Sequence, residues 1–357
     1  MSLFKGRKTE VEIYGESHAD KIGVRVKGFP EFTYSAEKLK EFSERRKPSL
    51  SVFSTKRREA DEPVFYRKDR SVISGGELPS EWYAEILNTD RKSGDYNELY
   101  GKPRPSHADY AWHLKDGALD FSGGGRFSGR LTAALCVAGG IAKEYLETLG
   151  ISIAAFVSEV GGVSGGTYKE ELISVKEIQR LREGEFPSLK NKAEIIEKIK
   201  SAAAEGDSLG GRIDCVITGV KAGTGDNLFG GLEGKLAQLL YAIPAVKGVE
   251  FGAGFDFAKM RGSEANDSLF YDEEGKAGFC SFNAGGINGG IANGAPITFS
   301  LAMRPTPSIY KEQDTIDLVK KENVKIKIKG RHDACIVPRA VPCAESAAAI
   351  AILDEIL

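Results

Sequence analysis

The stretch RPSHADYAWHLKDGALDFSGGGRFSGR, residues 104–130, is the part of the chain around which the rest is arranged. It combines two of the four histidines with several arginines and with glycines 123–125. Glycine lets backbone N–H groups approach an anion closely, so this run predicts a phosphate-binding loop. Apolar residues then recur every three or four positions from Leu131 to Leu149, which predicts a helix with its positive end beside the glycines. A plain glycine turn before an ordinary helix is the alternative for this stretch taken alone.

Composition narrows the class of protein. A length of 357 residues allows two domains, but no linker, repeat or low-complexity run divides the chain, so we expect one domain over residues 1–357 or two closely packed lobes. The net charge of −2 argues against a general nucleic-acid binder. Five cysteines without a CxxC pair predict neither a disulfide framework nor a thiolate metal site. No signal core or long apolar run is present, which favours a cytoplasmic protein without membrane contact.

Polar residues follow predicted strands and helices at several points of the chain. Alternating residues at 10–13 and 22–27 predict a hairpin that presents Glu16, Ser17 and His18 at its turn, where a histidine can also be merely solvated. A helix over about 36–46 ends in basic residues that either complement its dipole or bind a polyanion. These basic residues, including those that follow the helix, are Arg45, Arg46, Lys47, Lys56, Arg57 and Arg58.

Later segments follow the same pattern. Two clean alternations, over 297–303 and 324–329, predict strands that deliver Arg304 and residues 331–333 to loops. Residues 170–206 read as solvated helices without chemistry, and 152–160 and 212–220 read as strands. The alanine-rich segment 344–357 predicts a helix that packs closely against another element or a second subunit.

The four histidines, His18, His107, His113 and His332, all lie in polar segments. Histidine titrates near neutral pH, so a pair of them can donate protons to a leaving phosphate and to an anionic cofactor. Asp333, beside Arg331, is a candidate base. The wide spacing of His107 and His113 disfavours a metal site, and the lack of a GxSxG elbow disfavours a Ser-His-Asp hydrolase.

Three segments carry a resemblance to a known family. GESHAD, RPSHADY with the following GGGRFSGR, and RHDAC with RAVPCAES resemble the diagnostic segments of chorismate synthases, in the same order. Further matches spread the resemblance over nearly the whole chain: RRKPS, TKRRE, NTDRKSGDY, EGDSLGG, AVKGVEFGAGFD, NAGGINGG and RPTPS. The resemblance implies an α+β fold, a single large β-α-β sandwich domain of antiparallel sheets and helices, assembled as a homotetramer. It also implies a lyase that converts 5-enolpyruvylshikimate 3-phosphate to chorismate and phosphate by 1,4-elimination with reduced FMN, the last step of the shikimate pathway to aromatic amino acids.

The resemblance also implies roles for individual residues. His18 would protonate or balance the reduced flavin, His107 would protonate the departing phosphate, and Asp333 would help the flavin nitrogen to remove the ring proton. Ser17 and Ser128 would support this proton relay. The implied FMN contacts are Arg126, Phe127, Ser128, Pro244, Ala245, Gly289, Arg304, Pro305, Thr306, Pro307, Ser308 and Arg331. The implied positions for substrate or nucleotide are Arg46, Arg104 and Arg130.

The chain departs from the family pattern at six positions: Ala19, Val52, Ser106, Phe127, Leu131 and Ala334. These changes alter loop shape more than they remove proton donors, so we expect activity, with a shifted substrate preference left open. The chain lacks the extra segments of family members that reduce their own flavin with NADPH, which favours external reduction. Two other hypotheses stay open: a non-catalytic paralogue that binds a phosphorylated ligand or flavin, and a metal-dependent phosphatase.

Overall fold

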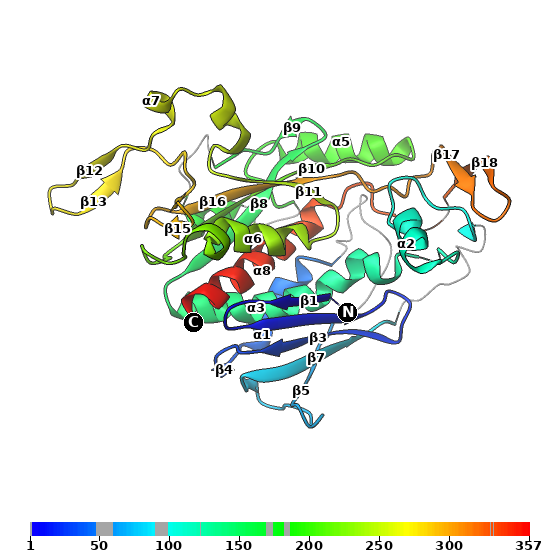
Figure 1. The fold of residues 1–357 in the computed structure, drawn as a ribbon, viewed down its shortest axis with the longest axis horizontal. Helices are drawn as coiled ribbons and strands as arrows, with labels where there is room; N and C mark the ends of the chain where they lie inside the picture. The colour runs from blue at the N-terminus through cyan, green and yellow to red at the C-terminus, as the bar shows by residue number, and fades with distance from the viewer. Residues whose placement is uncertain are drawn as a thin grey trace.

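Two five-stranded antiparallel sheets enclose a layer of helices (Figure 1). The structure is a computed structural model that describes residues 2–47, 60–89, 99–121, 123–168, 174–181, 186–328, 330 and 332–357. The first sheet has the order β1-β2-β3-β7-β5, with β1 (Ser2–Lys5), β2 (Glu10–Gly15), β3 (Lys21–Lys27), β7 (Glu81–Leu87) and β5 (Val64–Tyr66). The second has the order β11-β16-β10-β8-β9, with β11 (Val246–Phe251), β16 (Ile297–Met303), β10 (Gly211–Thr218), β8 (Ser152–Val160) and β9 (Val163–Ser164).

The helices that pack between the sheets are α1 (Ala36–Glu44), α3 (Thr132–Thr148), α6 (Leu232–Tyr241) and α8 (Val337–Ile356). The remaining helices are α2 (Asp109–Asp116), α4 (Val175–Leu181), α5 (Lys192–Ala204) and α7 (Gly262–Ala265), with 3₁₀ turns at η2 (Gly125–Phe127), η3 (Gly129–Leu131), η4 (Leu228–Gly230) and η5 (Gly254–Lys259). Short two-stranded pairs complete the described chain: β4 (Phe32–Thr33) with β6 (Glu77–Leu78), β12 (Leu269–Tyr271) with β13 (Ala277–Phe279), β14 (Ile287–Asn288) with β15 (Ile291–Ala292), and β17 (Glu312–Asp317) with β18 (Glu322–Lys327). None of the described helices is long and apolar enough to cross a membrane.

The predicted strands over 10–13, 22–27, 152–160, 212–220 and 297–303 are confirmed as β2, β3, β8, β10 and β16 of the two sheets. In β3, Ile22, Val24 and Val26 are buried against the helices, as their alternation predicts. In β16 the alternating polar residues Thr298 and Ser300 are also buried, because the second sheet is covered on both faces. One apolar core therefore extends from the first sheet through the helix layer to the second sheet.

Helix α8 lies at the centre of the molecule and packs along α3 (Figure 1). A Cβ atom at Gly139 of α3 would lie 2.3 Å from the Cα atom of Ser346 of α8, so the two helices approach closely at this point. The helix begins at Val337, seven residues before the predicted start, and nearly all of its residues are buried. Its small residues therefore pack inside the chain.

The N-terminal hairpin is attached to the end of α8 by one carboxylate. The backbone N–H groups of Arg7, Lys8 and Thr9 donate hydrogen bonds of 2.8–3.0 Å to the carboxylate oxygens of Asp354. Lys235 of α6 approaches the same carboxylate at 2.7 Å. Three elements distant in sequence thus meet at Asp354.

Candidate active site

The glycine loop before α3 supports the turn between β2 and β3. Gly123 and Gly125 adopt φ angles of +61° and +48°, a left-handed region that favours glycine. A Cβ atom at Gly123 would lie 2.0 Å from Nε2 of His18, so the imidazole packs directly on the glycine backbone. The backbone N–H of Ser17 donates to the carbonyl oxygen of Gly125 at 3.2 Å. Two of the predicted catalytic residues are thereby fixed against the predicted phosphate-binding loop.

His107 reaches the same loop through its neighbours. Its Nδ1 atom lies 2.5 Å from Oδ1 of Asp109, the first residue of α2. Arg104 donates to Asp109 at 2.7 Å and to the carbonyl oxygen of Gly123 at 2.6 Å. A short series of contacts therefore joins His107 to the glycine on which His18 packs.

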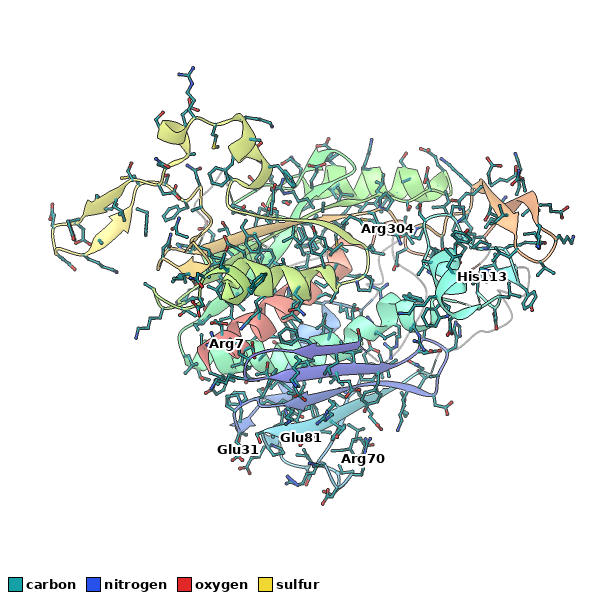
Figure 2. All side chains as sticks on the ribbon, in the orientation of Figure 1. Arg7, Glu31, Arg70, Glu81, His113 and Arg304 are labelled. Atoms are coloured by element: carbon teal, nitrogen blue, oxygen red, sulfur yellow. The ribbon has the colours of Figure 1, made fainter. Side chains whose placement is uncertain are left out.

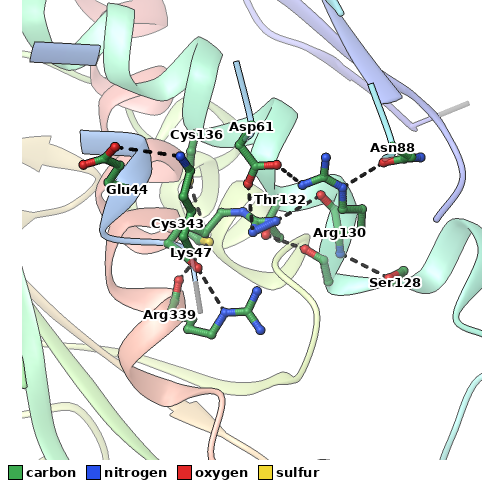
Figure 3. Close-up of polar contacts among 12 residues, drawn as sticks. Glu44, Lys47, Asp61, Asn88, Ser128, Arg130, Thr132, Cys136, Arg339 and Cys343 are labelled. Atoms are coloured by element: carbon green, nitrogen blue, oxygen red, sulfur yellow. Dashed lines mark hydrogen bonds and ion pairs between the residues drawn. The ribbon is translucent and has the colours of Figure 1, made fainter. Parts of the chain in front are cut away.

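Asp333 lies at the end of a chain of contacts through Arg130, Arg46 and Arg339; Figure 3 shows the part of this chain around Arg130 and Arg339. Arg130 and Arg46 share the carboxylate of Asp61, and Arg46 also donates to the carbonyl oxygen of Arg130 at 3.3 Å. Arg339 of α8 donates to the carbonyl oxygen of Arg46 at 3.0 Å and forms an ion pair with Asp333. Asp333 is thus connected to Arg130, which lies two residues after Ser128.

Arg46 and Arg130 are buried and Arg339 is partly exposed; in their described ion pairs these three arginines share two carboxylates, those of Asp61 and Asp333. Burial, together with the charge of Arg339, lowers the pKa of Arg46. Arg46, Arg104 and Arg130, which the resemblance assigns to substrate or nucleotide, all have partners within the protein. They hold the loops in place, and a direct contact with substrate stays a prediction.

The residues assigned to FMN fall into two groups near the same end of the sandwich. In the first, the guanidinium of Arg126 lies 4.5 Å from the ring centre of Trp112, and Phe127 packs against that ring edge to face. Ser128 caps the N-terminus of η3, and its hydroxyl accepts a hydrogen bond from the backbone N–H of Arg130 at 3.2 Å. The second group surrounds the end of β16, where Figure 2 shows Arg304 toward the end of the molecule that carries His113.

In the second group, one hydrogen bond joins two predicted segments. The backbone N–H of Arg304 donates to the carbonyl oxygen of Ala245 at 3.0 Å, which brings the turn at Pro244 to the end of β16. The carbonyl oxygen of Thr306 accepts from Ser208 at 2.7 Å, while the buried Thr306 hydroxyl has no hydrogen-bond partner among the described residues. The predicted residues Pro305, Pro307 and Ser308 belong to the same segment.

Other predicted residues are placed elsewhere. Gly289 lies in the exposed turn between β14 and β15, before the start of β16, whereas Arg304 follows the end of β16. Within one chain Gly289 is therefore separated from Arg304 by the length of that strand. Arg331, Val52 and the basic residues 56–58 lie outside the described residues.

Sequence reasoning missed three residues that organise the site. The side-chain amide of Asn88 donates to the carbonyl oxygens of Glu16 and Ala19 at 3.1 and 2.8 Å, which clamps the turn that carries His18. Asp61 and Arg339 hold the arginine chain. The partners of Asn88 and Asp61 lie far away in sequence, so no local motif marked these two residues. Arg339 and Asp109, by contrast, lie inside the quoted RAVPCAES and RPSHADY motifs, but the motifs alone assigned them no role.

Comparison with known proteins shows the family of the chain. A family model described as chorismate synthase matches residues 9–357. The chorismate synthase of Thermococcus kodakarensis is 41% identical over 356 residues, which cover 99% of this chain and 97% of the relative. That of Methanosarcina mazei is 40% identical over 354 residues, covering 99% and 95%.

A solved structure matches as well. A crystal structure of chorismate synthase superimposes with a TM-score of 0.72 at 24% identity, covering 99% of this chain and 92% of that one, and confirms the predicted α+β fold. Since the family model and these relatives match nearly the full length of the chain, the chain belongs to the chorismate synthase family and is a lyase.

Proposed function

We propose that the chain converts 5-enolpyruvylshikimate 3-phosphate to chorismate and phosphate with reduced FMN, as the last step of the shikimate pathway in the cytoplasm. The observation that carries this proposal is the convergence of His18 and the His107 group on Gly123. A phosphate leaving group needs a proton donor and nearby positive charge. This end of the sandwich provides both.

The residues present fit a flavin with its phosphate. Arg304 is half-buried, and among the described residues it has no ion-pair partner, so its charge is available to an anion. Ser17 and Thr306 have buried hydroxyls without a hydrogen-bond partner in the described chain, as polar groups that await a ligand would have. We propose that residues 126–128, 244–245 and 304–308 hold FMN, together with Arg331; Gly289, at the other end of β16, would contact FMN from a second copy of the chain. When bound, reduced FMN would supply electron density to the breaking C–O bond and a nitrogen that accepts the ring proton.

The protein's own side chains would then transfer protons and balance charge. His107 would hold a proton and donate it to the departing phosphate, a type of step that contributes on the order of 10²–10⁴-fold to rate. His18 would balance charge on the flavin, and Asp333 would assist removal of the ring proton. Fixed cations near the site would stabilise the charge that develops on phosphate.

An anaerobic assay tests the proposal. Purified protein, the enolpyruvyl phosphate substrate and dithionite-reduced FMN should release chorismate and phosphate in equal amounts. Omission of FMN should abolish both products, and addition of EDTA should change neither. Binding of both ligands without product would favour the non-catalytic paralogue, and phosphate release without FMN that EDTA inhibits would favour the phosphatase.

A second assay tests the source of the electrons. The same reaction with NADPH and oxidised FMN should give no product, because we propose external reduction of the flavin.

A further inference from the structure

The contact between His107 and Asp109 indicates which ring nitrogen of His107 carries a hydrogen. Nδ1 of His107 and Oδ1 of Asp109 are 2.5 Å apart, a separation that requires a hydrogen between the two atoms. Burial alone would raise the pKa of Asp109, but hydrogen bonds from Arg104 and His107 hold it at about 2. The carboxylate is therefore ionised at working pH and can only accept. The shared hydrogen belongs to Nδ1 of His107.

The contacts of Arg104 argue against the alternative assignment, in which Nδ1 of His107 accepts a hydrogen bond from Arg104 and carries no hydrogen. Its Nη2 atom lies 3.1 Å from Nδ1 of His107, but it also donates to Oδ1 of Asp109 at 2.8 Å. Two donors that share one acceptor oxygen come this close without bonding to each other. The second carboxylate oxygen accepts from the backbone N–H and Nε of Arg104 at 3.0 and 2.7 Å. Asp109 is thus oriented by four hydrogen bonds and cannot rotate away from the imidazole.

The other ring nitrogen of His107, Nε2, is available for proton transfer. Nε2 of His107 has no polar partner among the described residues, and the side chain is 14% exposed. When Nδ1 carries a fixed hydrogen, Nε2 is the atom that gains and loses a proton as the ring cycles between imidazolium and neutral imidazole. That is the behaviour that a proton donor to a leaving phosphate needs.

We infer that Asp109 is a positioning residue that fixes the Nδ1–H tautomer of His107 and so makes Nε2 the proton-donating atom. The inference rests on the proposed function for its effect on turnover, but not for the tautomer itself. Arg104 completes the unit, because its bond to the carbonyl oxygen of Gly123 sets the position of His107 relative to His18.

The test compares Asp109→Asn with wild type. Asparagine keeps the size of the side chain, and its NH₂ group can face His107 while its oxygen still accepts from Arg104. Nδ1 must then accept, which moves the proton of the neutral ring to Nε2. We expect kcat to fall on the order of 10²-fold, with less than threefold change in KM and in FMN affinity. The control Asp116→Asn, at the exposed end of the same helix, should leave kcat, KM and FMN affinity unchanged.

A double-mutant cycle separates positioning from a structural role. If Asp109 acts through His107, Asp109→Asn should cost less than threefold in kcat when it is added to His107→Ala. An equal loss in both backgrounds, or a lower melting temperature that accounts for the loss, would overturn the inference.

The tautomer can be read without any activity. The chain has four histidines, so ¹⁵N spectra of histidine-labelled protein are simple, and the loss of one ring system in His107→Ala assigns the signal. At alkaline pH we expect the proton of His107 on Nδ1 in wild type and on Nε2 in Asp109→Asn. The inference fails if wild type carries the proton on Nε2. If the tautomers are as expected but wild type makes no chorismate, the proposed reaction fails and the positioning role stands.

Discussion

Arg304 brings a positive charge into a half-buried position at the end of β16. Burial lowers its pKa, and the described residues provide no carboxylate to compensate for the lost hydration. An anionic ligand would restore that interaction, and hydrogen bonds to charged groups contribute about 1.5–3 kcal/mol. This residue is therefore the most direct probe of the proposed flavin site.

We expect Arg304→Ala to weaken FMN binding by about 10–100-fold, the equivalent of that energy. Titration calorimetry with FMN measures the change. Arg180→Ala, which removes an exposed arginine of α4, should leave the affinity within twofold. An unchanged affinity for Arg304→Ala would place the flavin phosphate elsewhere.

Ser106 illustrates how a departure from the family pattern is tolerated. Its φ angle is +57°, where a residue with a Cβ atom is strained by roughly 1–2 kcal/mol and glycine is not. A glycine at position 106 would adopt this backbone conformation without that strain. The backbone path is kept, and His107 still reaches Asp109.

At the scale of elements, the contact between α3 and α8 leaves no space at its centre. A Cβ atom at Gly139 would lie 2.1 Å from the Cβ atom and 2.3 Å from the Cα atom of Ser346. Relief requires the helices to separate, because a backbone atom cannot move as a flexible side chain can. Close packing of this kind is intolerant of added volume.

We expect Gly139→Ala to destabilise the protein by about 3 kcal/mol, at the upper end of the range for overpacking. Gly234→Ala in α6 is the matched control, since a Cβ atom there meets nothing within 4 Å. In Gly234→Ala the free energy of unfolding should rise by about 0.5–1 kcal/mol, because alanine lowers the entropy of the unfolded chain. Thermal unfolding of the two variants beside wild type measures both changes, and equal melting temperatures would contradict the prediction.

Asp354 makes the attachment of the N-terminal hairpin depend on pH. Burial acts to raise the pKa of this carboxyl, but Lys235 and the N–H groups of residues 7–9 hold it at about 2. The folded-state pKa therefore lies below the unfolded value of about 3.9. The interaction contributes roughly 2–3 kcal/mol above pH 4 and is lost as the pH falls from 4 toward 2.

Asp354→Asn should lower stability at pH 7 and should make stability less sensitive to pH between 4 and 2. Urea unfolding across this pH range measures both effects. Asp314→Asn, on exposed β17, should follow the wild-type curve. Parallel curves for Asp354→Asn and wild type would show that other carboxylates cause the acid sensitivity.

At the scale of the whole molecule, the sequence predicted which loops carry chemistry better than it predicted how they are held. Strand alternation placed Ser17, His18 and Arg304 at the ends of strands, and the apolar period from Leu131 placed the glycine loop at the start of a helix, because those periodicities depend on local burial. The contacts from Arg130 through Arg46 to Arg339 could not be predicted, since they join residues 84 and 293 positions apart. Only packing of the central helices brings these together.

The molecule exposes large apolar side chains that suit contact with further copies. Phe229 is fully exposed beside Leu228, and Phe255 and Tyr271 are about 80% exposed on segments that extend from the second sheet. Such surfaces commonly mark interfaces. We expect sedimentation equilibrium to give four times the chain mass, and Phe229→Ser to reduce that mass at micromolar concentration. A wild-type mass equal to one chain would exclude the homotetramer.

The central position of α8 has a consequence for biosynthesis. A ribosome makes this helix after every other described element, yet α3, α6 and the second sheet bury apolar surface against it. A nascent chain that ends before Val337 would leave the inner face of the second sheet and one side of α3 uncovered. Such intermediates aggregate readily, so translation that stalls late should burden chaperones more than translation that stalls early.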